Sequence, residues 1–291
     1  MKKVVMSDAG LEVSQSAYSF SRWINSDDIN LEKVKEMVTF VYNLGINTFD
    51  LSALFLNEKL CDYFVQSIDS LGVERGDLVY IVKVSNQNIG KQQEIVFSPL
   101  TEKSINTKIS EVLTSLKTSY VDLLLLENYD PLMRVDHVIS TLLKAKNQGE
   151  IRHFGVANFT VQQYKLFASR VEDEIITNHL SFNLLDNEAL EDGRIDLIKQ
   201  NYSKPLVFGP LANGRILNGM DAKAQRLRAV LVGLQEKYNS NVEQLAVAWL
   251  YKLDVLPIIG ALNKERIKNA TSASEMNLSY EDWHKIYLSV K

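Results

Sequence analysis

Short apolar segments alternate with amphipathic helical patterns along almost the whole chain, and this alternation limits the possible folds. The predicted strands are 16–20, 46–49, 78–82, 121–126, 151–156, 175–177, 205–208 and 256–259. The predicted helices are 31–44, 57–71, 102–116, 135–147, 161–169, 190–200, a stretch after 214, 242–253, 264–272 and 280–288. Strands separated by helices predict parallel crossover units. The nearly unbroken apolar run at 121–126 is typical of a parallel strand that is covered on both faces.

Eight such units follow one another in 291 residues without a linker or a change of composition. A doubly wound open sheet also fits the alternation, but this length and continuity favour a closed (β/α)8 TIM barrel. The segments 2–6 and 11–13, joined by a turn at 7–10, predict a β-hairpin before the first barrel strand. We therefore expect a single (β/α)8 domain over residues 1–291 with an N-terminal β-hairpin.

Composition excludes several classes of partner. The chain has 32 basic and 36 acidic residues, which gives no electrostatic reason to bind nucleic acid or an anionic membrane. Cys61 is the single cysteine, which fits a reducing compartment, and no apolar run reaches the roughly 20 residues that span a bilayer. The first ten residues do not form a signal peptide. We expect a cytoplasmic protein with a small-molecule substrate or ligand, and the sequence does not indicate an oligomeric state.

Polar residues follow the apolar part of five predicted strands: Asp50, Lys83, Glu127, Asn158 and His179. In a parallel barrel the carboxyl ends of the strands surround the active site. Asp50, Lys83 and Glu127 end three consecutive strands, so their charges are expected to converge and to shift one another's pKa values. An active site and a structural ion-pair network both remain as interpretations. A polar stretch at 86–93 predicts a loop, and Glu172, Asp173 and Glu174 predict an exposed acidic one.

Five segments carry a family resemblance. They are Gly-Ile-Asn-Thr-Phe-Asp at 45–50, Ile-Val-Lys at 81–83, Tyr-Val-Asp-Leu-Leu-Leu-Leu at 120–126, Gly-Val-Ala-Asn-Phe at 155–159, and Pro-Ile-Ile-Gly at 257–260 followed by Arg266. In this order the chain resembles the aldo-keto reductases over about residues 11–285. The resemblance implies a (β/α)8 barrel that binds NADP(H) without a Rossmann fingerprint, and the chain contains no Gly-x-Gly-x-x-Gly. It also implies hydride transfer from nicotinamide to a carbonyl carbon, with a proton from a tyrosine that Lys, Asp and His assist.

Two of the four implied catalytic positions depart from the family pattern. Asp50 and Lys83 match it, whereas Phe55 occupies the tyrosine position and Glu127 the histidine position. A phenylalanine cannot donate a proton, which argues against ordinary carbonyl reduction. The first hypothesis is an NADP(H)-dependent oxidoreductase whose acid is Glu127 or a water and whose substrate is conjugated or otherwise activated. The alternative is a non-catalytic barrel that binds NADPH, a small ligand or a protein partner.

The resemblance also implies cofactor positions. Asn158 is kept from a Ser-Asn pair and His179 stands for a glutamine, both beside the nicotinamide amide; His179 also fits a packed core histidine. The loop residues implied at the pyrophosphate are Gly209, Leu211, Asn213, Gly214 and Arg215, although Arg215 also fits a solvated charge at a helix start.

Arg266 is the residue implied at the adenosine 2′-phosphate. Ala261 and Asn263 replace the other family residues there, so NADP(H) binding is expected to be weakened unless Lys264 compensates. The aromatic residues Tyr18, Phe20 and Trp23 fit either a substrate pocket or the core. Dispersed histidines give no metal-ligand spacing, so we expect no metal site.

Overall fold

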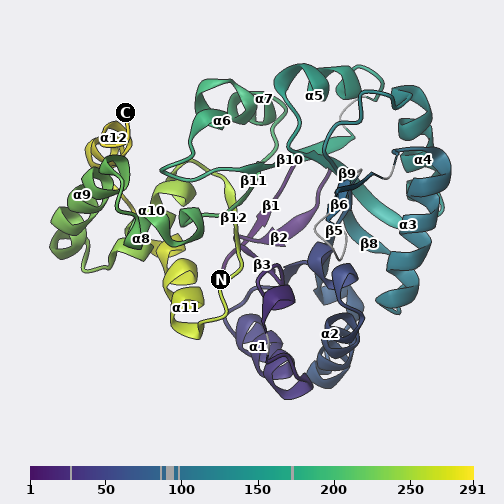
Figure 1. Cartoon of the computed structure of the whole chain (residues 1–291), viewed down its shortest axis with the longest axis horizontal. Coiled ribbons are helices and arrows are strands. Elements are labelled where there is room, and N and C mark those ends of the chain that lie inside the picture. Colours follow the sequence, from purple (N-terminus) through teal and green to yellow (C-terminus); the bar gives the residue numbers. More distant parts are fainter. Residues whose placement is uncertain (27, 86, 90–94, 98, 172–173) are drawn as a thin grey trace.

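A computed structural model describes residues 1–26, 28–85, 87–89, 95–97, 99–171 and 174–291. Eight parallel strands close into a barrel in the order β10-β11-β12-β3-β4-β5-β8-β9 (Figure 1). The barrel strands are β3 (Ala17–Ser19), β4 (Thr48–Asp50), β5 (Val79–Ser85), β8 (Val121–Glu127), β9 (Ile151–Ala157), β10 (Ile175–Ser181), β11 (Leu206–Phe208) and β12 (Leu256–Ile259). The predicted (β/α)8 barrel is confirmed.

Helices surround the barrel on its outer side. Figure 1 shows α1 and α2 together below the strands, α3 and α4 at the right, α5 to α7 at the top and α8 to α12 at the left. The helices are α1 (Leu31–Asn43), α2 (Glu58–Leu71), α3 (Glu102–Ser115), α4 (Val135–Asn147), α5 (Val161–Ala168), α6 (Glu188–Glu191), α7 (Arg194–Gln200), α8 (Arg215–Asn218), α9 (Ala222–Tyr238), α10 (Val242–Lys252), α11 (Lys264–Ser272) and α12 (Tyr280–Leu288).

The predicted amino-terminal hairpin is present as β1 (Lys3–Val5) paired antiparallel with β2 (Glu12–Ser14). Met6, Leu11 and Val13 of this region are buried in one cluster with the inward side chains of the barrel, including Ile81 and Leu125. The hairpin region therefore supplies apolar contacts to the barrel interior.

The polar stretch predicted as a loop after β5 contains a short ladder, which corrects that prediction in part. Strands β6 (Gln87–Ile89) and β7 (Ile95–Phe97) pair antiparallel, while residues 86, 90–94 and 98 lie outside the described residues. A sequence rich in asparagine and glutamine does not indicate a strand pair, because apolar and polar residues do not alternate clearly in it. Of the predicted acidic segment, 172 and 173 also lie outside the described residues, and Glu174 forms an ion pair with Lys146.

Helix starts follow local side-chain chemistry. Asn30 accepts a hydrogen bond from the Lys33 amide and begins α1, and Asn57 does the same for α2 through the Leu60 amide. Gly45 follows α1 with φ of 83°, a left-handed conformation that glycine adopts without strain. This turn directs the chain into β4, which carries Asp50.

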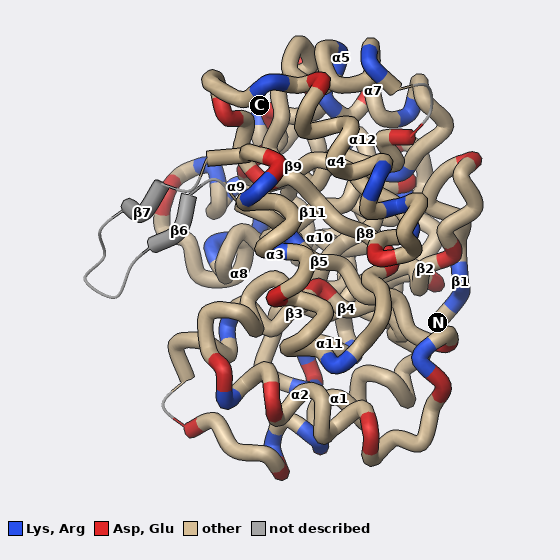
Figure 2. The backbone as a smooth tube through the Cα atoms, turned by 90° about the vertical axis from the view of Figure 1, so that its right-hand side faces the viewer, with Lys and Arg blue, Asp and Glu red and all other residues tan. Residues whose placement is uncertain are grey.

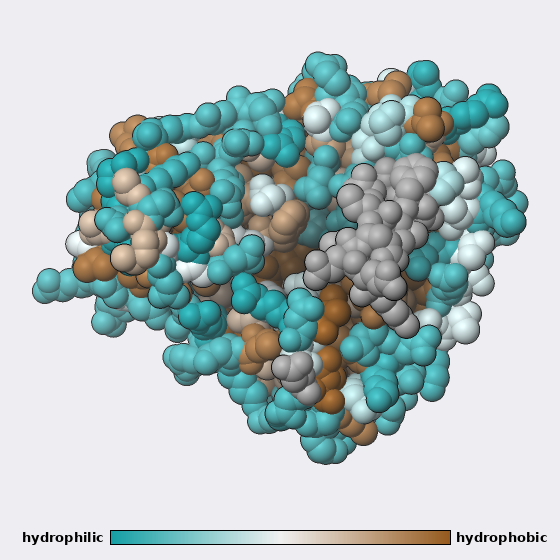
Figure 3. Space-filling view, in the orientation of Figure 1, coloured by the Kyte–Doolittle hydropathy of each residue, from teal (hydrophilic) through white to brown (hydrophobic). Residues whose placement is uncertain are grey.

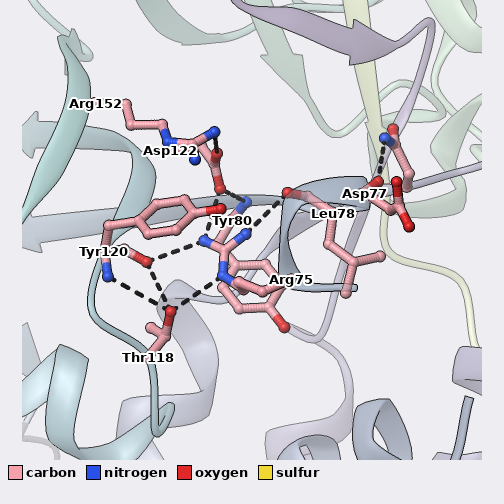
Figure 4. A network of polar contacts seen from close by, with 9 residues as sticks. Arg75, Asp77, Leu78, Tyr80, Thr118, Tyr120, Asp122 and Arg152 are labelled. Atoms are coloured by element: carbon pink, nitrogen blue, oxygen red, sulfur yellow. Dashed lines mark hydrogen bonds and ion pairs between the residues drawn. The ribbon is translucent and has the colours of Figure 1, made fainter. Parts of the chain in front are cut away.

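Asp122 is the centre of a polar network at the amino-terminal end of β8. Its carboxylate accepts hydrogen bonds from Arg75 Nη2 at 2.7 Å and from the Tyr80 amide at 2.9 Å, and Arg152 Nη1 lies 3.4 Å away. Figure 4 shows the Asp122 carboxylate between the two guanidinium groups, with Arg75 also close to the Tyr80 and Tyr120 rings. Because Asp122 is 1% exposed, this network compensates a buried charge at the end of the barrel opposite Glu127.

Charges of both signs are interspersed along the chain on the side that Figure 2 presents, so no large surface of one sign forms there. None of the helices within the described ranges has the length and apolar character required to cross a membrane.

Candidate functional site

Two cavities meet at the carboxyl ends of the barrel strands. The first has a volume of about 910 Å³ and extends toward α3, and the second has about 560 Å³ and extends toward α11. Both are lined by the same five residues, which we call the shared wall: Ser19, Ser21, Asp50, Lys83 and Glu127. On the face shown in Figure 3, apolar residues gather near the centre and hydrophilic residues surround them.

The register of the strands explains why the three charged residues of the shared wall converge. Lys83 on β5 is level with Leu125 on β8, and Asp50 on β4 is level with Ile81 on β5. Ile81 and Leu125 point into the barrel, so Lys83 and Glu127, each two residues further along, lie on the same inward face above them. The predicted convergence of the three strand ends is therefore present in the structure.

Lys83 and Glu127 form a partly buried ion pair. Lys83 Nζ donates a hydrogen bond to Glu127 Oε1 at 3.0 Å, and the two side chains are 18% and 23% exposed. Burial lowers the pKa of Lys83, but attraction to Asp50 and Glu127 outweighs burial and raises the pKa above its usual value. Lys83 is therefore an ammonium group at neutral pH.

Asp50 is held by a residue that the sequence reasoning missed. The Ser52 hydroxyl donates to Asp50 Oδ1 at 2.6 Å, and the Ser52 amide donates to the same oxygen at 3.1 Å. Burial would raise the pKa of Asp50, but Lys83, His179 and the two Ser52 hydrogen bonds together lower it. Asp50 is thus an ionised carboxylate, and a serine two residues after the acid was the signal available in the sequence.

His179 lies in the wall of the second cavity and is 1% exposed. Within the described residues, neither ring nitrogen has a hydrogen-bond partner, and the ring packs edge-on against Phe208. Burial and the Lys83 ammonium lower the pKa of His179 to about 3, although Asp50 acts in the opposite direction. The imidazole is therefore neutral, with one N–H donor and one acceptor nitrogen unsatisfied.

Phe55 lies in the 3₁₀ segment Ser52–Leu56 and lines the first cavity. No tyrosine is among the described residues that line either cavity. Tyr18 and Phe20 are fully buried, Trp23 is 5% exposed, and all three lie in the core outside both cavities. Of the two interpretations of these three aromatics, the core position is the one that the structure supports.

The loop before α8 borders the second cavity, and all five of its predicted residues line it: Gly209, Leu211, Asn213, Gly214 and Arg215. Asn213 and Gly214 have φ values of 52° and 91°, so the loop depends on residues that tolerate the left-handed region. Arg215 is half exposed and lies 3.6 Å from Asp186 and 3.5 Å from Asp221. The Arg215 guanidinium can therefore bind a ligand at the surface of the cavity, because the ion pairs that it would exchange for that contact are weak.

Arg266 also lines the second cavity, at the first turn of α11. Its Nε lies 3.1 Å from Glu243 Oε1 in an ion pair, and Asn263 caps the helix by accepting from the Arg266 backbone amide. Lys264 forms an ion pair with Glu36 and does not line this cavity. Both cations expected at this end of the cavity are thus already paired with carboxylates, which the sequence alone did not reveal.

Asn158 does not line either cavity among the described residues. Asn158 follows β9 with φ of 59°, and its backbone N–H donates to the His179 backbone carbonyl at 2.9 Å. The part of the chain that the structure describes contains no cluster of three or more histidine, cysteine, aspartate or glutamate side chains suited to a metal ion.

Comparison with known proteins agrees with this architecture. The family model of the aldo/keto reductase family matches residues 18–288. The chain is 27% identical over 293 residues to the oxidoreductase YdhF of Escherichia coli (strain K12), covering 98% of this chain and 96% of that relative. It is 30% identical over 195 residues to the uncharacterized oxidoreductase YcsN of Bacillus subtilis (strain 168), covering 66% of this chain and 65% of that relative.

A third relative is a 6-dehydroglucose reductase of Agrobacterium fabrum, 23% identical over 99% of this chain and 97% of its own length. Among solved structures, a thermostable aldo-keto reductase in complex with the inhibitor epalrestat superposes with a TM-score of 0.83 at 20% identity, covering 99% of this chain and all of the other. The aldo-keto reductase of Bombyx mori in complex with NADP gives 0.81 at 18% identity, covering 99% and 92%. The fold agrees with both structures, and the match to the family model shows that the chain belongs to the aldo/keto reductase family.

Proposed function

We propose that this protein is an NADP(H)-dependent oxidoreductase that reduces a small carbonyl compound and uses Lys83 as the proton donor. The observation that carries the proposal is the shared wall, where two cavities open on the same ammonium and carboxylate groups. A cofactor in the second cavity and a substrate in the first would then meet beside Lys83. The oxidoreductase relatives and the NADP-bound structure of Bombyx mori support this class of reaction.

The residues of the second cavity fit a nicotinamide nucleotide. The neutral imidazole of His179 has one unsatisfied donor and one unsatisfied acceptor, and a carboxamide provides the complementary pair. The loop 209–215 and the guanidinium of Arg215 suit a diphosphate, and Arg266 at the far end suits a further phosphate. Arg266 is already paired with Glu243, so we expect weak discrimination between NADPH and NADH.

When bound, the cofactor supplies a hydride to the carbonyl carbon. Lys83 supplies the proton in this proposal, because it lines both cavities and Phe55 offers no hydroxyl. As the carbonyl oxygen gains electron density, the ammonium stabilises it and transfers one proton to it. The amine left on Lys83 then takes a proton from water.

Glu127 and Asp50 act on Lys83 in this proposal. Glu127 accepts a Lys83 hydrogen bond and therefore orients the ammonium, while Asp50, fixed by Ser52, stabilises the positive charge. The Glu127 carboxylate is thus a positioning group in reduction, which departs from the expectation that Glu127 or a water is the acid.

The non-catalytic alternative also has a specific observation in its favour. Lys83 is paired with Glu127, and Phe55 makes the adjoining part of the first cavity apolar. A barrel of this kind would bind a nucleotide, another small ligand or a protein partner without turning over.

The two candidates separate in one series of measurements. Titration with NADPH and with NADH, followed by calorimetry, is expected to give binding of both nucleotides with affinities within about tenfold, because Arg266 is shared with Glu243. Turnover of an aldehyde and enone panel is then compared for the native protein, Lys83→Met and Glu127→Gln. The oxidoreductase requires a loss of about 100-fold or more in Lys83→Met. Nucleotide binding without turnover by the native protein would favour the non-catalytic barrel, and absence of nucleotide binding would exclude the proposed oxidoreductase.

A further inference from the structure

We propose that Glu127 and Lys83 also catalyse a reaction that needs no cofactor: proton transfer at the carbon next to the carbonyl of a small α-hydroxylated aldehyde or ketone. This inference goes beyond the proposed oxidoreductase, because no hydride moves and the second cavity is not required. It assigns Glu127 as a general base and Lys83 as the group that polarises the carbonyl.

Glu127 has the position required of the base. It lines both cavities, and its side chain remains 23% exposed. Oε1 accepts from Lys83, and the described part of the chain offers no hydrogen-bond donor to Oε2. One carboxylate oxygen is therefore held in place while the other is left to approach a C–H group of a ligand.

Lys83 has the position required of the group that polarises the carbonyl. One of its three N–H groups is bonded to Glu127, and the described residues give it no second hydrogen-bond acceptor. Because Nζ and Oε1 are 3.0 Å apart, the carbonyl oxygen and the α-hydrogen of one small substrate can reach the cation and the carboxylate together. A carbonyl bonded to an ammonium is a stronger carbon acid, because the cation stabilises the enolate oxygen.

The step balances without an oxidant or a reductant. Glu127 removes the α-hydrogen as a proton, the electrons of that C–H bond form the C=C bond, and the carbonyl π electrons move to the oxygen beside Lys83. In an α-hydroxylated substrate the product is an enediol or its anion. Once the proton on Glu127 has exchanged with water, its return to the same carbon places solvent hydrogen there. Its return to the former carbonyl carbon interconverts an aldose and a ketose, because the proton of the α-hydroxyl group leaves to water and the former carbonyl oxygen takes one from water.

The first cavity suits a hydroxylated ligand. Seven of the described residues that line it carry hydroxyl groups: Ser19, Ser21, Ser52, Ser85, Thr101, Ser104 and Thr107. They lie at or just after the carboxyl ends of β3, β4 and β5 and at the start of α3, whereas Phe55 and Leu56 contribute an apolar side. Hydroxyl groups that donate and accept hydrogen bonds match the several hydroxyls of a short sugar-like carbonyl compound.

The other titratable groups of the site are poorer candidates for the base. Asp50 Oδ1 already accepts two hydrogen bonds from Ser52, and the carboxylate is only 5% exposed. His179 lines the second cavity and is not among the residues that line the first. Of the two carboxylates in the shared wall, Glu127 is therefore the better candidate for the base.

The test is hydrogen exchange without any nucleotide. Dihydroxyacetone is incubated in D₂O with the native protein, and loss of its C–H signal and appearance of glyceraldehyde are followed by ¹H NMR. We expect exchange with the native protein to exceed exchange with heat-denatured protein by about tenfold or more. The rate that remains after the heat-denatured rate is subtracted should fall by about 100-fold in Glu127→Gln and in Lys83→Met. Glu236→Gln, an exposed position on α9, is the matched control and should equal the native protein.

Exchange no faster than with denatured protein would overturn the inference, as would full exchange in Glu127→Gln. Circular dichroism melting shows whether each variant is folded, and Glu127→Asp, which keeps the carboxylate, should retain part of the exchange if Lys83→Met does not fold. Nucleotide binding without exchange removes this inference and leaves the oxidoreductase proposal standing. Exchange without nucleotide binding supports this inference and removes the oxidoreductase.

Discussion

The Ser52 hydroxyl donates a 2.6 Å hydrogen bond to Asp50 Oδ1, and this bond helps to keep the carboxylate ionised beside Lys83. In Ser52→Ala we expect a loss of about 1–2 kcal/mol in the free energy of unfolding at pH 7, because a hydrogen bond to a buried charge is removed. The folded-state pKa of Asp50 is lowered from 3.8, so this stabilisation is present above pH 3.8 and is lost as the pH falls through the folded pKa. Urea unfolding at several pH values measures it.

The matched control is Ser70→Ala on the exposed side of α2, with an expected change below about 0.5 kcal/mol. A Ser52→Ala protein as stable as the native one at pH 7 would contradict the role given to this hydroxyl.

Introducing a phenol at position 55 should increase carbonyl reduction. Phe55 lines the first cavity, so the hydroxyl in Phe55→Tyr would enter that cavity and add a proton donor. We expect kcat/KM for aldehyde reduction to rise by about tenfold or more. Steady-state kinetics with NADPH measures the rise, and Leu132→Tyr, at a position 87% exposed, should leave the rate unchanged. A rate in Phe55→Tyr equal to that of the native protein would show that position 55 does not limit proton transfer.

His179 should make the fold sensitive to acid. The unfolded-state pKa is 6.5 and the folded-state pKa is about 3, so between these values the unfolded chain binds a proton that the folded chain excludes. Stability therefore falls as the pH decreases from 6.5 toward 3, by at most about 1.4 kcal/mol per pH unit from this residue. His179→Gln should flatten the profile in that window, as measured by chemical unfolding. Parallel profiles for the two proteins would be inconsistent with a buried neutral imidazole.

The network around Asp122 should contribute to stability and not to binding. Asp122→Asn leaves Arg75 and Arg152 without their carboxylate, and we expect a loss of about 3 kcal/mol, the lower end for a broken buried pair, since Arg75 is 22% exposed. Asp136→Asn breaks an ion pair whose aspartate is 74% exposed and should cost less than about 0.5 kcal/mol. Thermal unfolding and NADPH titration of both variants provide the comparison, and weaker nucleotide binding by folded Asp122→Asn would argue against a purely structural role.

Replacing Gly155 in the barrel interior by alanine should destabilise the fold. A Cβ atom there would lie 2.9 Å from both Leu125 Cδ2 and the Thr177 carbonyl oxygen. We expect Gly155→Ala to lower the unfolding free energy by about 1–3 kcal/mol through overpacking. Gly76→Ala meets no atom within 4 Å and is the control, with an expected change no larger than about 1 kcal/mol. Equal stabilities of the two variants would mean that β9 shifts freely.

The barrel and the three charges of its rim could be predicted from the sequence because both follow from local patterns. An apolar run that ends on Asp50, Lys83 or Glu127 indicates a strand and its polar end at once. Ser52 and Glu243 could not be assigned in the same way. Ser52 acts through a turn of the chain beyond β4, and Glu243 reaches Arg266 from a different helix. The Ser52 contact is local, but hydrophobic periodicity does not report side-chain hydrogen bonds, and the Glu243 contact depends on tertiary packing.

Asp122 and Glu127 stand at opposite ends of one strand, β8, five residues and therefore about 16 Å apart. Asp122 pairs with arginines at the amino-terminal end of β8, and Glu127 lines the cavities at the carboxyl end. Energetic effects at positions this far apart are generally additive. The rim residues can consequently be exchanged over evolutionary time, or by an engineer, while the opposite end of the same strand continues to support the barrel.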